Sequence, residues 1–256
     1  MVDKMEQHER PIGFNPGFKF PGGNRSITFD AASFTAWVED ALPAVKTMTP
    51  CEHRQATERG IKVGNYYFYL RPLPMYEMRA NWMFSTKLHK RRCGLPIYRR
   101  MTKAYVYFSD VVNIPVLCNA KLEPWMSLTP NEVLTQRNTI RRAKGNVGMA
   151  GLGMGWAAKQ MLQKKTVKHL TIYERDQAVI DVFGKPLQEQ YTDRVTLLCG
   201  DAYEADWGQH DIALWDIWPG YGDADFDPEF KAIKKKLEAV GTPCIGWGDN
   251  VYDKRY

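Results

Sequence analysis

The chain of 256 residues is 44% hydrophobic and 25% charged, and its formal net charge is +6. These values are typical of a globular protein and exclude the disordered and fibrous classes. No apolar run approaches the roughly 18 residues that cross a bilayer, and the N-terminal MVDKMEQHERPIG lacks the apolar segment of a secretory signal. We therefore expect a soluble, cytoplasmic protein with no membrane partner.

Charge is distributed unevenly along the chain. Residues 1–145 contain 22 Lys and Arg against 12 Asp and Glu, a balance of +10, whereas residues 146–256 contain 13 against 17, a balance of −4. This contrast suggests two roles on one chain. We predict an N-terminal α+β region over residues 1–126, with a part in substrate binding, and a second domain over residues 127–256.

The cysteines and histidines show no metal-binding or disulfide pattern. The five cysteines are scattered without a C-x-x-C pair, and the five histidines form no H-E-x-x-H motif. Reduced thiols are the ordinary state of such cysteines in the cytosol. The sequence therefore predicts no metal site.

The N-terminal region is predicted to mix helix and strand. Residues 1–25 are rich in Gly, Pro and Asn and predict an irregular arm, whereas apolar spacing over 28–46 predicts a helix that Asp30 or Thr28 caps and Pro43 ends or kinks. Segments 61–78 and 103–120 are dense in aromatic and β-branched residues, which favours short strands. A strongly basic stretch, KLHKRRCGLPIYRRMTK at 87–103, lies between them.

A capped helix leads into the second domain. In residues 127–142, Thr129 is a good N-cap, Pro130 suits the first helical position, and Glu132 completes a capping box. After Gly145 the chain alternates apolar runs with helical patterns. The predicted strands are 146–150, 169–174, 194–200, 211–217 and 242–248, and the predicted helices between them are 156–164, 176–190 and 228–240.

This alternation predicts the fold class. Continuous apolar strands that are each followed by a helical stretch indicate a parallel sheet covered on both faces. We therefore predict an α/β fold, a Rossmann-like parallel sheet with helices on both faces, preceded by a smaller, strand-rich α+β region.

The first strand of that sheet runs into a glycine-rich turn. Gly151, Gly153 and Gly155 allow a tight turn and a close approach of the backbone to a ligand. Because Trp156 occupies the next position, the spacing is G-x-G-x-G and not the dinucleotide pattern G-x-G-x-x-G. A cofactor with an amino-acid end is therefore favoured over one with a pyrophosphate.

Carboxylates follow the next three strands at the same edge of the sheet. Glu174 ends the second strand, where nucleoside-binding α/β folds place an acid for the ribose hydroxyls. Asp201 and Ala202 follow the third strand and could line an adenine, although Asp201 could equally cap a helix. Asp216 lies at the end of the fourth strand and would lie beside the reacting group.

In this order and spacing, AGLGMG, IYERD, LCGDA and LWDIWP resemble the class I S-adenosylmethionine (SAM)-dependent methyltransferases. The resemblance covers about 105 residues, 144–248. It implies SAM as cofactor, with the three glycines around its methionine end, Glu174 on the ribose and Asp201 on the adenine. Asp216 would lie near the methionine amino group or the acceptor, as the catalytic residue.

The layout of a strand-rich region, a capped helix and this core also looks like the polyamine (spermidine) synthases. Those enzymes carry an aspartate in the glycine loop where this chain has Met154, a departure that disfavours aminopropyl transfer. A second departure concerns the methyltransferase core, which normally adds two further strands after the fifth. Either the sheet is short here, or strands from residues 61–120 complete it.

The acceptor is predicted only by class. Arg91 and Arg92 in the basic stretch suit a nucleic acid or another anionic substrate, and Trp218 and Tyr221 could wall the substrate site. The acidic residues at 223, 225 and 227 could receive a cation, but a helix entry is the favoured interpretation. The leading prediction is a SAM-dependent methyltransferase; the alternatives are an aminopropyltransferase and a non-catalytic module that binds SAM or nucleic acid.

Overall fold

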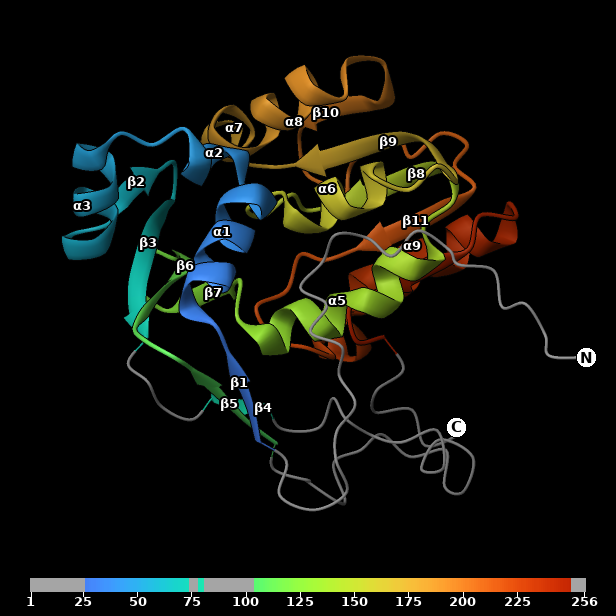
Figure 1. Cartoon of the computed structure of the whole chain (residues 1–256). Coiled ribbons are helices and arrows are strands. Elements are labelled where there is room, and N and C mark those ends of the chain that lie inside the picture. The colour runs from blue at the N-terminus through green and yellow to red at the C-terminus, as the bar shows by residue number, and fades with distance from the viewer. Residues whose placement is uncertain (1–25, 74–77, 81–103, 250–256) are drawn as a thin grey trace, which may run out of the picture.

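The computed structural model describes residues 26–73, 78–80 and 104–249 (Figure 1). The basic stretch at 87–103, with Arg91 and Arg92, lies outside the described residues, and so does the predicted arm at 1–25. None of the helices in the described ranges combines the length and the apolar composition that a bilayer span requires.

The second half of the chain forms one parallel sheet of five strands. Its order is β10-β9-β8-β11-β12, and every neighbouring pair is parallel. The strands are β8 (Gly145–Ala150), β9 (Val167–Glu174), β10 (Val195–Cys199), β11 (Ile212–Trp215) and β12 (Cys244–Gly246). The chain first adds strands on one side of β8 and then places β11 on the other, so the topology switches between β8 and β11. Ligands of open α/β sheets bind at the carboxyl ends of the strands at such a point.

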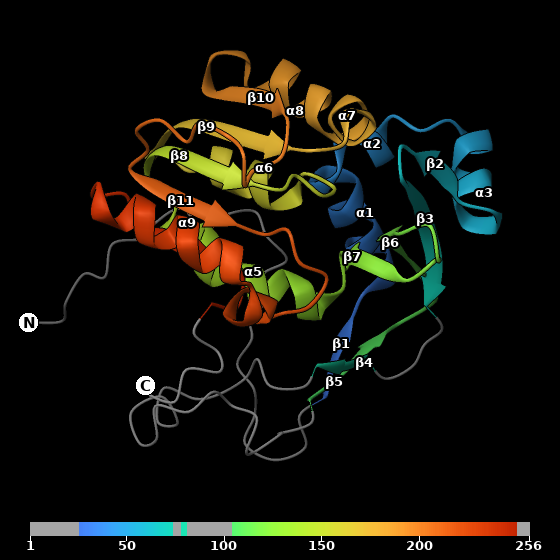
Figure 2. The ribbon, with the colours of Figure 1, turned by 180° about the vertical axis from the view of Figure 1, so that it is seen from behind.

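Helices cover both faces of this sheet. Figures 1 and 2 show α5 and α6 in front of the sheet in one view and α9 in front in the opposite view. The elements are α5 (Pro130–Arg142), α6 (Trp156–Leu162), α7 (Gln177–Val179), η2 (Ile180–Gly184), α8 (Lys185–Gln190), η3 (Thr192–Arg194), η4 (Asp223–Phe226) and α9 (Pro228–Ala239). The predicted Rossmann-like fold class is confirmed.

The N-terminal strands pair with one another and not with the parallel sheet. Two further sheets have the orders β2-β3-β6-β7 and β1-β5-β4. Their elements are β1 (Ser26–Phe29), β2 (Ile61–Val63), β3 (Tyr66–Leu73), β4 (Met78–Ala80), β5 (Ala104–Phe108), β6 (Val112–Cys118) and β7 (Pro124–Ser127), together with α1 (Ala31–Ala41), α2 (Pro43–Lys46) and α3 (Pro50–Glu58). Within the described residues, the parallel sheet is therefore a short one that the strands of 61–120 do not complete.

The sequence Thr-Pro-x-Glu begins both α3 and α5, but it forms a complete capping box only in α3. At α3, Thr49 accepts the Glu52 N–H and the Glu52 carboxylate accepts the Thr49 N–H, a complete capping box that we did not predict. At α5, Thr129 accepts the Glu132 N–H, but the Glu132 carboxylate turns to Ser127. The capping box predicted at 129–132 is therefore wrong in its second half, because Ser127 offers two donors, its N–H and its hydroxyl.

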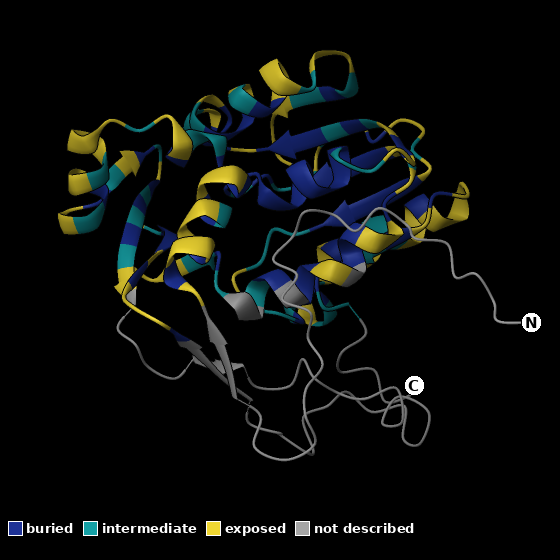
Figure 3. Ribbon diagram, in the orientation of Figure 1, coloured by how far each residue is buried: buried dark blue, intermediate teal, exposed yellow. Residues whose placement is uncertain are grey.

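Helix α1 joins the N-terminal sheets to the parallel sheet. Asp30 caps it by accepting the Ser33 N–H at 2.7 Å, as predicted. The Trp37 ring meets Trp156 of α6 edge-on, with 6.4 Å between centroids. In Figure 3 the outer face of α1 is exposed and its inner face is buried. One continuous apolar core thus runs from α1 through both halves of the chain.

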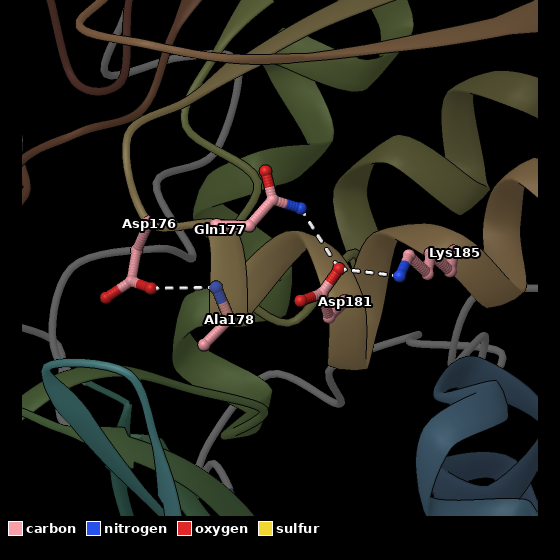
Figure 4. A network of polar contacts seen from close by, with 5 residues as sticks. All are labelled: Asp176, Gln177, Ala178, Asp181 and Lys185. Atoms are coloured by element: carbon pink, nitrogen blue, oxygen red, sulfur yellow. Dashed lines mark hydrogen bonds and ion pairs between the residues drawn. The ribbon is translucent and has the colours of Figure 1, made fainter.

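Asp176 makes a second, polar connection between the two halves. Its carboxylate accepts the Ala178 N–H at the start of α7 and the Asn65 N–H in the β2–β3 turn, both at 2.9 Å. Figure 4 shows the bond to Ala178. Beside it, Asp181 accepts a hydrogen bond from the Gln177 side chain and forms an exposed ion pair with Lys185. Gly64 permits the approach of the turn, since a Cβ there would lie 2.2 Å from the Asp176 carboxylate.

We expect Asp176→Ala to lower the free energy of unfolding by about 1–2 kcal/mol, because it removes the acceptor of two partly buried backbone N–H groups. Urea unfolding checks this. Asp181→Ala is the matched control and should lower the free energy of unfolding much less, since the Asp181–Lys185 ion pair is exposed. Equal losses in the two variants would contradict the connecting role of Asp176.

Candidate functional site

A cleft of about 230 Å³ lies at the carboxyl ends of β8, β9, β10 and β11, where the N-terminal sheet faces them. Its lining draws on both halves of the chain. The N-terminal half and α5 contribute Tyr66, Leu117, Trp125, Met126, Ser127, Leu128, Glu132, Val133 and Gln136. The parallel-sheet half contributes, among others, Gly151, Gly153, Trp156, Glu174, Arg175, Asp201, Ala202, Asp216 and Trp218.

The glycine turn after β8 lines the cleft with Gly151 and Gly153, whereas Gly155 is the N-cap of α6 and is not among the lining residues. Gly151, Gly153 and Gly155 have φ values of +84°, +54° and +80°, which side chains rarely tolerate. A Cβ at position 151 would lie 2.3 Å from the Asp216 carbonyl oxygen, and a Cβ at position 153 would lie 2.2 Å from the Met126 sulfur. The first two glycines therefore let the turn pack against β7 and the loop after β11.

Glu174 holds this turn in place. It is 8% exposed. One carboxylate oxygen accepts the Leu152 N–H at 2.9 Å and the other accepts the Asp176 N–H at 3.0 Å. A carboxylate has about four acceptor positions, so each oxygen keeps capacity for a further donor in the cleft.

Asp201 and Ala202 lie side by side on the cleft wall after β10. Asp201 accepts the Tyr203 N–H at 2.9 Å and so closes a turn, not a helix. Asp201 is exposed, whereas Ala202 is buried. A charged rim and an apolar surface thus adjoin at this point.

Trp218 lines the cleft, and Asp227 fixes its position. The Trp218 indole N–H donates to Asp227 at 2.8 Å, and the Tyr203 hydroxyl donates to the same oxygen. Asp227 also caps α9, as the helix-entry interpretation predicted. Tyr221 is not among the cleft-lining residues; its ring meets Trp247 edge-on, with 5.4 Å between centroids.

Asp216 and Glu132 bring two carboxyl groups to one corner of the cleft. Gln136 donates its amide N–H to Asp216, and Glu132 lies one turn earlier on α5. Burial raises the pKa of Asp216 to about 7, although the Gln136 bond opposes the shift. Burial also raises the pKa of Glu132 to about 8; its Ser127 bonds oppose the shift and the Asp216 charge adds to it.

Sequence reasoning did not select several of these cleft residues. The sequence pattern predicts only a capping role for Glu132, and no motif includes Gln136, although polar residues four apart on a helix share one face. Trp125 and Met126 belong to β7, which we did not predict. Arg175, whose guanidinium donates to Tyr66 at 3.1 Å and lies over the Trp125 ring, could be found only from the packing of the two halves.

The chain is similar to several solved structures at low identity and over part of their length. No family model matches the chain, and no curated protein matches it significantly. Similar solved structures include a dimethyladenosine transferase from Plasmodium falciparum (15% identity, TM-score 0.36, 46% of this chain and 41% of that one). The SAH-bound methyltransferase PaMTH1 from Podospora anserina (16%, 0.32, 41% and 46%) and the [4+2]-cyclase SpnF (16%, 0.29, 34% and 35%) are also similar. The chain thus spans less than half of each of these structures.

We expect the buried Glu132 carboxyl to make stability fall with rising pH. Its pKa in the folded protein exceeds its unfolded value, so the folded state binds more protons between about pH 4.5 and 8. The free energy of unfolding should therefore decrease there by up to about 1.4 kcal/mol per pH unit from this group. Urea unfolding at pH 5.5, 6.5 and 7.5 should give a shallower slope for Glu132→Gln.

Glu189→Gln provides the control for this comparison, because Glu189 is an exposed carboxyl on α8. This variant should keep the slope of the unmodified protein. Parallel pH profiles for Glu132→Gln and the unmodified protein would show that Glu132 is ionised in the folded state at neutral pH.

Proposed function

We propose that the chain is a SAM-dependent methyltransferase that binds SAM in this cleft. The observation that carries the proposal is the buried Glu174 carboxylate at the end of β9, bonded to the glycine turn at the switch point of a parallel sheet. An acid at this position, with spare acceptor capacity, suits the vicinal hydroxyls of a ribose.

The chemistry of the cleft fits the parts of SAM. Glu174 would hold the ribose, and the adjoining Asp201 and Ala202 would hold the polar and apolar parts of the adenine. The turn at Gly151 and Gly153 would lie along the methionine end. The surface of the cleft combines apolar and polar groups, as small-molecule sites usually do.

The roles of the remaining residues follow from their chemistry. When bound, SAM supplies an electrophilic methyl group, and its transfer depends on positioning more than on acid–base chemistry. Asp216, with a pKa of about 7, can orient an acceptor or take a proton from it near neutral pH. Trp218, held by Asp227, would exclude water from the same side. We propose Asp216 as the catalytic residue and Trp218 as a substrate contact.

The alternative functions differ from methyl transfer in the step after ligand binding. Aminopropyl transfer is less favoured because Met154, where polyamine synthases carry an aspartate, is 2% exposed and donates its backbone N–H to the Met126 sulfur at 3.0 Å. A nucleic-acid acceptor, a role for Arg91 and Arg92, and the division at 126/127 stay predictions. A non-catalytic module would bind SAM without turnover.

Calorimetry with SAM, S-adenosylhomocysteine and NAD tests the proposal. We expect both adenosyl-sulfur compounds to bind and NAD to bind far more weakly. Glu174→Gln should reduce their affinity at least tenfold, because a carboxamide offers one acceptor oxygen where two are used. Glu189→Gln should bind as the unmodified protein does. Tight NAD binding without SAM binding would overturn the proposal.

A further inference from the structure

Basic side chains gather at the amino edge of the parallel sheet, opposite the cleft. We name this surface the basic edge. It consists of Arg141 and Arg142 at the end of α5, Lys144 before β8, and Lys165 and Lys168 around the start of β9, and all five are exposed. In Figures 1 and 2 the amino ends of β8 and β9 lie on the side of the sheet away from the N-terminal strands β2, β3 and β6. The basic edge is therefore a surface separate from the proposed SAM site.

Hydrogen bonds hold the two chain segments of the basic edge side by side. The Gly145 N–H donates to the Thr166 carbonyl at 2.7 Å, and β8 and β9 pair in parallel from this point. The Lys164 ammonium group covers the end of α5 by donating to the Ile140 carbonyl at 2.7 Å and to the Arg141 carbonyl at 3.0 Å. Because neighbouring strands lie about 4.8 Å apart, the basic side chains project from adjacent points of one surface.

The positive charge of the basic edge is not balanced locally. Asp211 contributes a negative charge beside β8, where its carboxylate accepts the Asn146 N–H at 2.7 Å. Within the described part of the chain, Arg142, Lys144 and Lys168 form no ion pair with a carboxylate. These three cations can therefore pair with an anion from another molecule.

The cleft at the other edge of the sheet carries the opposite charge. Five of the residues that line it are Asp or Glu, and Arg175 is the one Lys or Arg among the described lining residues. Like charges repel, so a polyanion is attracted to the basic edge and not to the cleft. The two edges of one sheet thus suit two different partners.

We propose that the basic edge binds the phosphate backbone of a double-stranded nucleic acid. A duplex presents one phosphate charge every roughly 3.4 Å along each strand, and Lys and Arg side chains neutralise such charges. Contacts to phosphate carry no sequence information, so this binding is independent of base sequence. It is also independent of SAM, because the basic edge lies opposite the cleft.

The composition of the basic edge favours a duplex over other anionic partners. The segments 141–146 and 164–169 contain no Phe, Tyr or Trp, whereas proteins that bind single strands stack the bases on aromatic rings. The large apolar side chains that are exposed in the described structure also lie outside these two segments. Helices that bind membrane surfaces insert such apolar side chains, so a membrane is the less favoured partner.

Fluorescence anisotropy with short labelled duplexes of RNA and of DNA, both of one base sequence, tests the proposal. We expect a duplex to bind the full chain, with an affinity that falls at least about tenfold between about 50 and 200 mM salt. The triple variant Arg142→Gln, Lys144→Gln, Lys168→Gln should bind at least about tenfold more weakly. It should also lower the slope of log affinity against log salt by about three, one for each cation removed. Binding of either duplex supports the proposal, and the tighter one identifies the type of nucleic acid.

The matched control removes three exposed lysines from the N-terminal half of the chain, on α2, on β2 and in the turn after β6. The variant Lys46→Gln, Lys62→Gln, Lys121→Gln changes the net charge by the same amount and should keep the affinity and the salt slope of the unmodified protein. Each single substitution in the basic edge should lower the slope by about one, which tests the proposal even where the triple variant does not fold.

Three results would overturn the proposal: no binding of either duplex, equal losses of affinity in the two triple variants, or an unchanged salt slope in the basic-edge variants. Flotation with vesicles of equal parts phosphatidylcholine and phosphatidylserine tests the membrane alternative. Vesicle binding that the basic-edge substitutions abolish, without duplex binding, would assign the surface to a membrane and also overturn the proposal.

Discussion

The buried Glu174 carboxylate is the interaction on which the rest of the site depends. Its two oxygens accept the N–H of Leu152 in the glycine turn and the N–H of Asp176 after β9, so one side chain fixes the ends of two neighbouring strands. Asp176 in turn accepts the Asn65 N–H from the N-terminal half. A short chain of charge-assisted bonds therefore sets the glycine turn, the edge of the parallel sheet and the N-terminal wall in one arrangement.

The two ends of the cleft differ in chemistry. The side near β9 and β10 offers the Glu174 carboxylate, the apolar surface at Ala202 and the Arg175 side chain, which donates to Tyr66. The side near α5 offers Glu132, Gln136 and Asp216, and burial raises the pKa values of the two carboxyl groups there. The fold alone does not determine the reaction, because proteins with the same sheet topology catalyse many different reactions.

Sequence patterns predicted the parallel sheet well, because its five strands are apolar runs and its turns carry glycine. They placed Glu174 and Asp216 at strand ends, since strand direction alone brings both to one edge. They did not predict which of several nearby donors a side chain binds. The Glu132 carboxylate accepts from Ser127, two residues before the helix cap, and no local rule distinguishes Ser127 from Thr129 as its partner. They also missed β7, because a four-residue strand leaves little pattern, and α3, although Thr49 and Glu52 carry the signature of a capping box. Contacts such as Arg175 with Tyr66 depend on how two sheets meet, which is not a local property.

A crystal structure of the protein with S-adenosylhomocysteine tests the central claim most directly. The account predicts that both ribose hydroxyls lie within hydrogen-bond distance of the Glu174 carboxylate, with the adenine against Ala202 and the amino-acid end toward Asp216. Clear density for the nucleoside elsewhere on the molecule, with Glu174 still bonded only to Leu152 and Asp176, would contradict it.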